Sequence, residues 1–417
     1  MKWFSSCSAS LRLNEKRLTG FTVFVILLCL LNLIINNINH RFFVSDFKVY
    51  YYAAKNLLVG GKVYFIAFGE ESGLYKYSPL TLLLFLPYTL VNFKVAAVIH
   101  FFILSFAYWY SYMLIRRLLA KYFFVNIGNE GWLLSLAVIC TLIFLVKELY
   151  LGNINILLIM LCLKALIIFV SGQNNKGSIL LGLVILTKPF FLILILPLLF
   201  RGKFKALAGM VIIVAAGLII PFMIIGSQQG FSLTMDWFKT IVMHGSDFPS
   251  MNSIDYLLHF YLFPGLKGYT EYLIIFVAGI LVIWFILKNL QQEKKLTGLN
   301  YLQDRNFIIE WFLILAMLPN IVKTDTEHFL ASAPIITFII YYIAGKRRFW
   351  LIPVMVILIF FYGGNSQDAL GKDFSYRLFS MGLIGLSNLL LIFMALLLYL
   401  DFRSSSLPTH SPEGIGE

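Results

Sequence analysis

The sequence predicts an all-α polytopic membrane protein with about twelve transmembrane helices, and composition and apolar runs both support this fold class. Hydrophobic residues make up 60% of the 417 residues and charged residues only 13%, whereas a soluble domain has roughly 45–50% and 25%. Apolar runs long enough to span a bilayer recur along the chain. No polar stretch between them is long enough to bury its own core, so residues 1–417 are expected to form a single membrane domain.

Twelve segments have the composition of membrane spans. They are residues 20–38, 94–117, 131–149, 153–171, 177–187, 189–200, 204–226, 270–290, 307–322, 328–345, 349–363 and 379–400. A further apolar run at 79–92 is only 14 residues long and contains two prolines, Pro79 and Pro87. A helix of that length covers about 21 Å of a hydrocarbon core of about 30 Å. We expect this run to be re-entrant or interfacial.

The distribution of Lys and Arg sets the predicted topology. If the run at 79–92 does not cross, the later basic clusters lie on the same side as the basic N-terminus. They contain Arg116, Arg117, Lys121, Arg201, Lys203, Lys205, Lys294, Lys295, Lys346, Arg347, Arg348 and Arg403. The positive-inside rule then places both termini in the cytoplasm and makes 39–93 and 227–268 large exoplasmic loops. Residues 404–417 are expected to form a disordered tail.

The formal net charge of +13 raises the question of nucleic-acid binding. The basic residues are dispersed at helix ends and form no stripe, so no nucleic-acid partner is expected. Topological signalling and attraction to anionic membrane lipids explain the charge.

Lys188 lies between two apolar segments that are each too short to cross alone, 177–187 and 189–200. Either the pair forms one helix kinked at Pro189, or two short helices meet at a polar apex. The first arrangement would place Arg201 and Lys203 outside, so the charge pattern favours the second. Lys188 is then held at membrane depth, where an ammonium group is costly and usually functional; the alternative is a side chain that snorkels to the interface.

With this topology five polar motifs fall on the exoplasmic side. They are Asp46, the Gly152-Asn153-Ile154-Asn155 segment, Lys188, the Asn252-Ser253 pair and the Thr324–His328 loop. Asp325, Glu327 and His328 in that loop could be read as metal ligands, but solvated loop charge is the preferred interpretation. No metal and no cofactor are expected.

Asp46 stands at the start of a predicted amphipathic helix on the membrane surface. Behind it Tyr50, Ala53, Ala54, Leu57 and Leu58 recur at helical spacing, and Gly60-Gly61 has the pattern of a helix C-cap. An N-cap is the plain alternative for this aspartate. For the tyrosines of this loop, an interfacial aromatic belt is slightly favoured over sugar stacking.

The polar motifs together resemble glycosyltransferase family 87, the polyprenyl-phosphate-mannose-dependent mannosyltransferases of GT-C fold. The matching array consists of Asp46, Tyr50, Ala53-Ala54, Gly60-Gly61, Tyr64, Tyr77-Ser78-Pro79-Leu80, Gly152-Asn153, Asn155, Gly182, Thr187-Lys188-Pro189, Asn252-Ser253 and His328. Three places depart from the family pattern. The family often has Tyr-Pro-Pro at 77–79 and Asn-Gln-Ser at 251–253, and its late helix often opens with Ser-Pro and paired histidines, where this chain has the single His328.

The resemblance implies a GT-C-like bundle that transfers a hexose, most simply mannose, from a polyprenyl-phosphate donor to a lipid or glycan acceptor. The acceptor hydroxyl needs a base, and the leaving phosphate needs positive charge. Asp46 is the candidate base, and Lys188 and His328 are the candidate phosphate partners. The candidate substrate-binding residues are Tyr50, Tyr64, Tyr77, Asn153, Asn155, Asn252 and Ser253.

Two other functions stay open from the sequence. A secondary transporter would show an inverted repeat and ionisable residues in both halves, whereas only Lys164 and Lys188 lie deep in apolar surroundings. A lipid-linked glycan ligase or polymerase would use a diphosphate-linked oligosaccharide as donor.

Overall fold

The computed structural model describes residues 2–40, 42, 44–69, 73–125, 127–243, 251–262, 270–295, 300–322, 325–364 and 367–405, and the regular secondary structure of this part is almost entirely helical. Among these residues the β-structure is a single isolated bridge between Ala67 and Leu74. Most of the predicted tail at 404–417 lies outside the described residues, as does Thr324.

Residues 2–243 contain eleven described α-helices and two 3-10 helices. They are α1 (Lys2–Ile38), α2 (Ser45–Leu58), α3 (Pro79–Phe85), η1 (Leu86–Leu90), α4 (Phe93–Tyr122), α5 (Glu130–Cys140), α6 (Leu142–Leu151), α7 (Asn155–Val170), α8 (Asn174–Thr187), η2 (Pro189–Ile195), α9 (Leu196–Phe200), α10 (Phe204–Ile225) and α11 (Ser227–Met243).

The second half continues with further helices of mixed length. They are α12 (Ile254–Tyr261), α13 (Thr270–Lys295), α14 (Asn300–Ile321), η3 (Thr326–Ser332), α15 (Ala333–Gly345), η4 (Phe349–Leu351), α16 (Ile352–Gly363), α17 (Gln367–Leu370), α18 (Lys372–Ser380) and α19 (Leu383–Ser404). The segment 227–268, expected as a loop, therefore carries α11 and α12.

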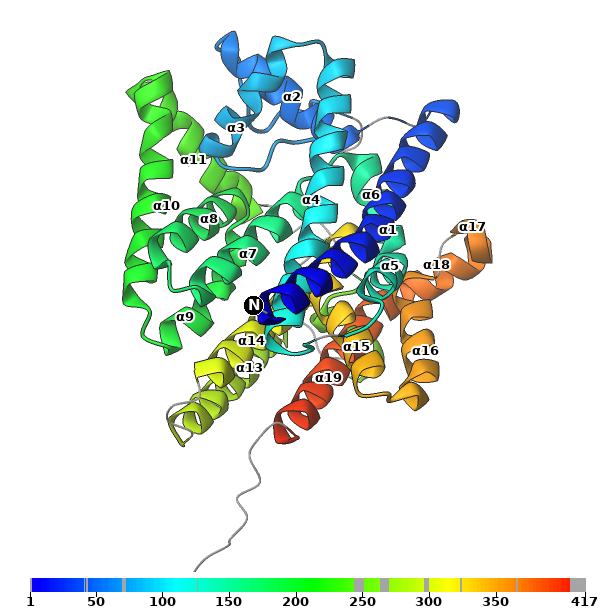
Figure 1. Ribbon diagram of the computed structural model, residues 1–417. Helices are drawn as coiled ribbons and strands as arrows, with labels where there is room; N and C mark the ends of the chain where they lie inside the picture. The colour runs from blue at the N-terminus through cyan, green and yellow to red at the C-terminus, as the bar shows by residue number, and fades with distance from the viewer. Residues whose placement is uncertain are drawn as a thin grey trace, which may run out of the picture.

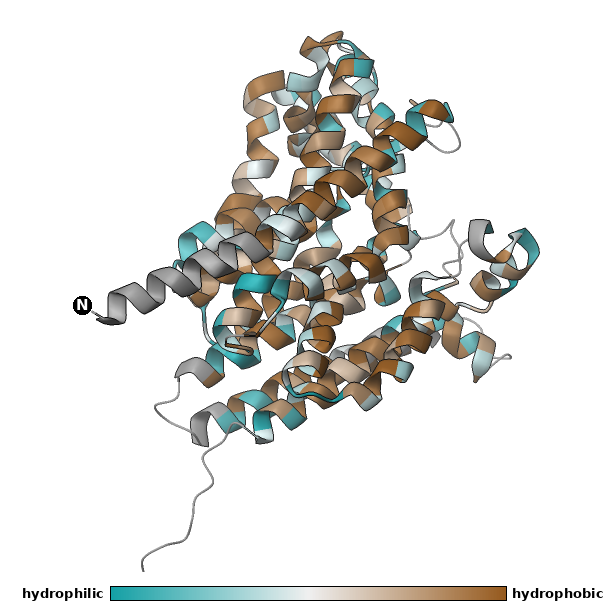
Figure 2. Cartoon of the chain, turned by 45° about the vertical axis from the view of Figure 1, so that its right-hand side comes forward, coloured by the Kyte–Doolittle hydropathy of each residue, from teal (hydrophilic) through white to brown (hydrophobic). Residues whose placement is uncertain are grey.

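The protein is a membrane protein whose helices carry apolar residues over most of their length (Figure 2). Five described helices are long and apolar enough to cross a bilayer, or six if the bent pair α5 and α6 is one span. Several other apolar helices have only 10–17 residues. The structure thus supports a polytopic helical fold, while the predicted count of about twelve is not reached by this criterion.

The helices α2 and α3 lie together at one end of the bundle, and α4 runs from them toward the opposite end (Figure 1). α8 packs between α7 and α10, and α14 packs against α19 and η3. Figure 1 shows that α13, α14 and α19 reach the end of the molecule away from α2.

Helix α2 has the expected C-terminal cap. Gly60 has φ +70°, Gly60 N donates to Leu57 O at 3.0 Å and Gly61 N donates to Asn56 O at 2.9 Å, which is the hydrogen-bond pattern of a Schellman motif. Tyr50, Ala53, Ala54 and Leu57 are buried as one face. Leu58, expected with them, is exposed, because it lies in the final turn at the margin of that face.

Prolines interrupt the helices of the two short apolar segments, 79–92 and 177–200. The run at 79–92 forms α3 and η1, which together have 12 residues and are shorter than a span. The Ser78 side chain caps α3 by accepting from Thr81 N. At 188 the chain turns extended, with φ −135° and ψ 99°, because the residue before a proline is disfavoured in the α region. The break predicted at Lys188 is therefore present.

Candidate active site

Asp46 lies in the first turn of α2, and its carboxylate contacts the turn between α6 and α7. Its Oδ2 accepts a hydrogen bond from Asn153 Nδ2 at 2.8 Å. The N-cap position of α2 belongs to Val44, and no side chain caps the helix, so the N-cap interpretation of Asp46 is wrong. Burial, aided by the negative charge of Glu327 and opposed by Lys188, raises the pKa of Asp46 to about 6.

A tight turn between α6 and α7 brings Asn153 to Asp46. Gly152 ends α6 with φ +67°, and a Cβ at this position would lie 2.9 Å from Phe47 Cβ and 3.1 Å from Val44 Cβ. Only glycine therefore allows the turn to approach α2 so closely. Asn153 Oδ1 accepts from Ile154 N at 2.7 Å, which fixes the amide so that its NH₂ group points at Asp46.

Three tyrosines of the first loop support this amide. The hydroxyls of Tyr50 and Tyr77 are 2.9 Å apart, and Tyr77 OH donates to Asn153 Oδ1 at 3.2 Å. Tyr64 OH donates to Tyr77 O at 2.7 Å. All three rings are buried, so the interfacial belt favoured from the sequence is wrong for them. Their observed contacts position Asn153 and each other.

Lys188 and His328 come together beside this cluster, from segments 140 residues apart. Lys188 Nζ donates to Asn155 Oδ1 and lies 3.1 Å from His328 Nε2. The ammonium also lies 5.4 Å from the centre of the Tyr77 ring. The Lys188 side chain is buried, which excludes the snorkelling alternative. The segment 153–155 thus connects both halves of the site, Asp46 through Asn153 and Lys188 through Asn155.

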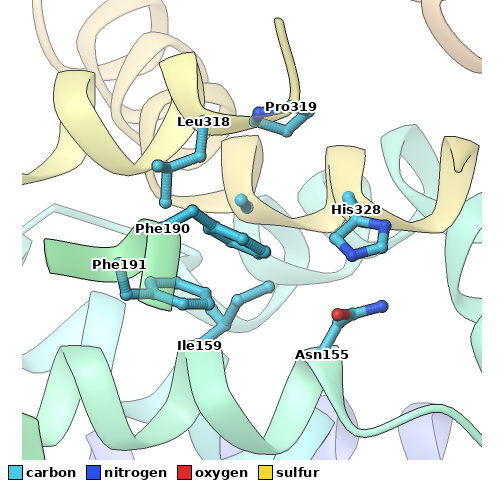
Figure 3. A pocket seen from close by; sticks show the side chains of 8 residues that line it. Asn155, Ile159, Phe190, Phe191, Leu318, Pro319 and His328 are labelled. Atoms are coloured by element: carbon cyan, nitrogen blue, oxygen red, sulfur yellow. The ribbon is translucent and has the colours of Figure 1, made fainter. Parts of the chain in front are cut away.

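An apolar cavity opens next to His328 and Asn155, which lie near each other at one side of it (Figure 3). Phe190 and Phe191, two and three residues after Lys188, line the cavity from η2, and Figure 3 shows the Phe190 ring between Leu318 and Ile159. The complete lining consists of Asn155, Ile159, Phe190, Phe191, Leu318, Pro319, His328 and Ala331.

Sequence reasoning missed two charged residues of α6. Glu148 is fully buried and accepts from Ile156 N at 2.9 Å and Asn155 Nδ2 at 3.0 Å, so it fixes the amide that holds Lys188. Its neighbour Lys147 bonds to Thr326 Oγ1 at 2.9 Å and pairs with Glu327 at 3.0 Å. The sequence did offer a signal for them, because two adjacent ionisable residues inside a predicted membrane span are costly and usually functional.

Sequence reasoning also missed His100 on α4, which contacts the turn between α6 and α7 at Gly152. Its Nε2 lies 2.9 Å from Gly152 O and its Nδ1 lies 3.2 Å from Tyr88 OH. The assignment that satisfies both contacts has Nε2–H donating to Gly152 O and Tyr88 OH donating to Nδ1. Phe47 of α2 stacks on the imidazole at 4.2 Å between ring centres.

Asn252 and Ser253 are buried before α12. Asn252 Oδ1 accepts from Gly385 N at 3.1 Å, and Asn252 O accepts from Asn320 Nδ2 at 2.9 Å. A Cβ on Gly385 would lie 2.2 Å from Asn252 O. These contacts join Asn252 to α14 and α19, so the structure places the Asn252-Ser253 pair apart from the candidate side chains that contact one another around 153–155.

The acidic loop before η3 is only partly solvated. Asp325 is exposed, as expected, but Glu327 is 1% exposed, so solvated loop charge is wrong for this residue. It lies against Lys147, which compensates its charge. Within the described part of the chain no group of three or more His, Cys, Asp or Glu residues is placed to hold a metal ion.

Fold and site define a helical membrane protein with a half-buried carboxylate at Asp46, a buried ammonium at Lys188 and an adjoining apolar cavity. The model of glycosyltransferase family 87 matches residues 75–302, more than half of the chain. The protein therefore belongs to glycosyltransferase family 87 and is a glycosyltransferase. The matched region includes Tyr77, Asn153, Asn155 and Lys188. No curated protein matches the chain.

Proposed function

We propose that the protein transfers a hexose, mannose in the simplest case, from a polyprenyl-phosphate donor to a hydroxyl of a lipid or glycan acceptor at the exoplasmic face. The observation that carries the proposal is the pairing of Asp46 with Asn153 and of Lys188 with Asn155. A base and a cation are thereby held side by side by one short segment. This is the arrangement that substitution at a phosphate-linked sugar carbon requires.

Asp46 is the proposed general base. It takes the proton of the acceptor hydroxyl while that oxygen forms a bond to the anomeric carbon of the donor sugar. A pKa of about 6 leaves Asp46 ionised at neutral pH yet more basic than an ordinary aspartate. Asn153, fixed by Ile154 N and the tyrosines, keeps the carboxylate oriented.

Lys188 is the proposed partner of the leaving phosphate. As the bond between the anomeric carbon and the phosphate oxygen breaks, negative charge grows on that oxygen, and a buried, preoriented ammonium stabilises it. His328 adds a second nitrogen at 3.1 Å from Lys188 Nζ. The resemblance to polyprenyl-phosphate-dependent mannosyltransferases is what favours a lipid-linked donor over a soluble one.

The family membership argues against a transporter, because the family is one of glycosyltransferases. A ligase or polymerase that uses a diphosphate-linked glycan is the remaining alternative. A panel of polyprenyl-phosphate monosaccharides and diphosphate-linked oligosaccharides, offered to the purified protein, separates these activities by the donor consumed.

The proposed orientation predicts which ends of the helices react with an impermeant thiol reagent added outside cells. In a Cys7→Ser background, Cys29, Cys140 and Cys162 are buried and should stay silent. Lys62→Cys, at an exposed position after α2, is expected to be labelled, whereas Arg117→Cys is expected to be protected until the membrane is permeabilised. Labelling of Arg117→Cys in intact cells would overturn the orientation.

The raised pKa of Asp46 predicts the pH dependence of transfer. Because only the ionised carboxylate accepts a proton, kcat/KM is expected to fall as pH drops through about 6. Glu327→Gln removes a negative charge that raises this pKa, so the acid limb should move to lower pH. A pH profile that is unchanged in Glu327→Gln would show that Asp46 does not govern the limb.

A further inference from the structure

The end of α4 that points away from Asp46 has features that the transfer reaction does not use. α4 has 30 residues and is therefore about 45 Å long, longer than a hydrocarbon core of about 30 Å. Its first residue, Phe93, contacts Phe47 of α2, and the helix runs toward the opposite end of the bundle (Figure 1). Its last turns therefore reach the lipid headgroup layer on the side away from α2.

A groove of about 490 Å³ opens along these last turns. Tyr110, Met113 and Leu114 line the part nearer the middle of the helix, and Arg117 and Lys121 line the part nearer its end. The groove thus changes from apolar to cationic along the direction in which a bilayer changes from hydrocarbon to headgroup. A phospholipid has the same order of apolar and charged parts.

Two of the three cations that line this groove have no carboxylate partner among the described residues. Arg116 also lines it but pairs with Glu130 at 2.5 Å. Arg117 and Lys121 are exposed, and within the described part of the chain no ion pair involves either of them. An anion that reaches the groove therefore meets two positive charges that no described carboxylate pairs with.

Lys164 of α7 adds a third positive charge near the apolar part. It lies in an otherwise apolar helix, and its Nζ donates to Tyr110 OH at 3.1 Å and lies 5.7 Å from the centre of the Tyr110 ring. A lysine at this depth is costly unless it meets a polar or anionic partner. Through Tyr110 it makes the wall of the groove polar as well as aromatic.

We propose that this groove binds one anionic phospholipid, with its phosphate on Arg117 and Lys121 and an acyl chain along Tyr110, Met113 and Leu114. A phosphate between two cations gains charge-assisted hydrogen bonds, and the acyl chain keeps its apolar surroundings. The site is specific for a lipid with net negative charge, because a zwitterionic headgroup brings its own cation to the same two residues. The proposal is independent of the sugar-transfer reaction.

The test uses the full-length protein reconstituted in vesicles of four parts phosphatidylcholine to one part phosphatidylglycerol. After gentle detergent extraction, native mass spectrometry counts the lipids that stay bound. The wild-type protein is expected to retain one phosphatidylglycerol in preference to phosphatidylcholine. The Arg117→Gln/Lys121→Gln double variant is expected to bind it about 30-fold more weakly, the size expected for losing two headgroup cations.

The matched control is Lys205→Gln/Arg347→Gln, which removes the same charge from exposed positions outside the groove and is expected to retain the lipid. Thermal unfolding midpoints verify that both double variants are folded. Equal retention by wild type and the groove variant would overturn the proposal. An equal loss of lipid in the control variant would also overturn it, because that result would mean diffuse electrostatic attraction. Equal retention of phosphatidylcholine and phosphatidylglycerol by the wild type would overturn it as well.

Discussion

Asp46→Asn is expected to lower the rate of sugar transfer by about 10²–10⁴-fold, the usual contribution of general acid–base catalysis. Asparagine keeps the size of the side chain, and its carbonyl oxygen still accepts the hydrogen bond that Asn153 Nδ2 donates at 2.8 Å. The substitution therefore removes the base while it preserves the contact. The rate constant of a single turnover with saturating donor measures the effect without a contribution from product release.

Stability separates this loss of activity from unfolding. Folding raises the pKa of Asp46 to about 6, so the folded state binds the proton more tightly than the unfolded state. The contribution of Asp46 to stability is then largest below the unfolded pKa of about 4 and is lost as pH rises through about 6. The neutral side chain of the Asp46→Asn variant avoids this loss, and the thermal midpoint at neutral pH should not fall.

The matched control for this experiment is Asp325→Asn, a nearby carboxylate that is exposed. It is expected to transfer sugar at nearly the wild-type rate. Full activity of a well-folded Asp46→Asn protein would remove Asp46 from the mechanism, and the search for the base would then move to Glu327.

Lys188→Met is expected to slow transfer by about 10²–10³-fold, the cost of removing one preoriented electrostatic group. Methionine fills a similar volume beside Tyr77 but supplies no charge to the leaving phosphate. Lys188→Arg should keep part of the activity, because the charge remains although the geometry of the contact with Asn155 changes. Initial rates over a range of donor concentrations measure both kcat and KM.

The control for Lys188 is Lys176→Met, an exposed lysine in the first turn of α8, the helix that ends just before Lys188. It is expected to leave both constants unchanged. If Lys188→Met were folded and had wild-type kinetics, the phosphate would have to be met by another group. If it were unfolded, Lys188→Arg would still test the role, since this variant keeps the buried charge that the surrounding carboxylates require.

Local features of the site were predictable because they depend on neighbours in the chain. Gly60-Gly61 predicted the cap of α2, and Pro189 predicted the break at Lys188, since glycine and proline restrict the backbone regardless of the fold. Five polar motifs and the family resemblance also predicted that Asp46, Asn153, Asn155, Lys188 and His328 belong to one site. The structure places these five side chains in contact with one another through the segment 153–155, while their roles in transfer stay a prediction.

Features that depend on which helix face meets which neighbour were not predictable. From the sequence, Tyr50 and Tyr77 fit an interfacial belt slightly better than sugar stacking, and only the packing of α2 on the 152–155 turn buries them. The importance of Glu148 was missed because the predicted span 131–149 was judged by its mean composition. Its backbone partner, Ile156 N, lies beyond the turn at Gly152. Asn252 was expected in a long loop at the site, but it packs on α19 instead.

The most direct test of the proposed activity is the donor that the purified protein consumes. With a radiolabelled hexose on polyprenyl phosphate and a mixed membrane-lipid acceptor, the protein is expected to form a labelled glycolipid or glycan. It should also release free polyprenyl phosphate in equal amount. A diphosphate-linked oligosaccharide offered in parallel should remain intact. Transfer from the diphosphate-linked donor alone would contradict the proposal and identify the protein as a glycan ligase or polymerase.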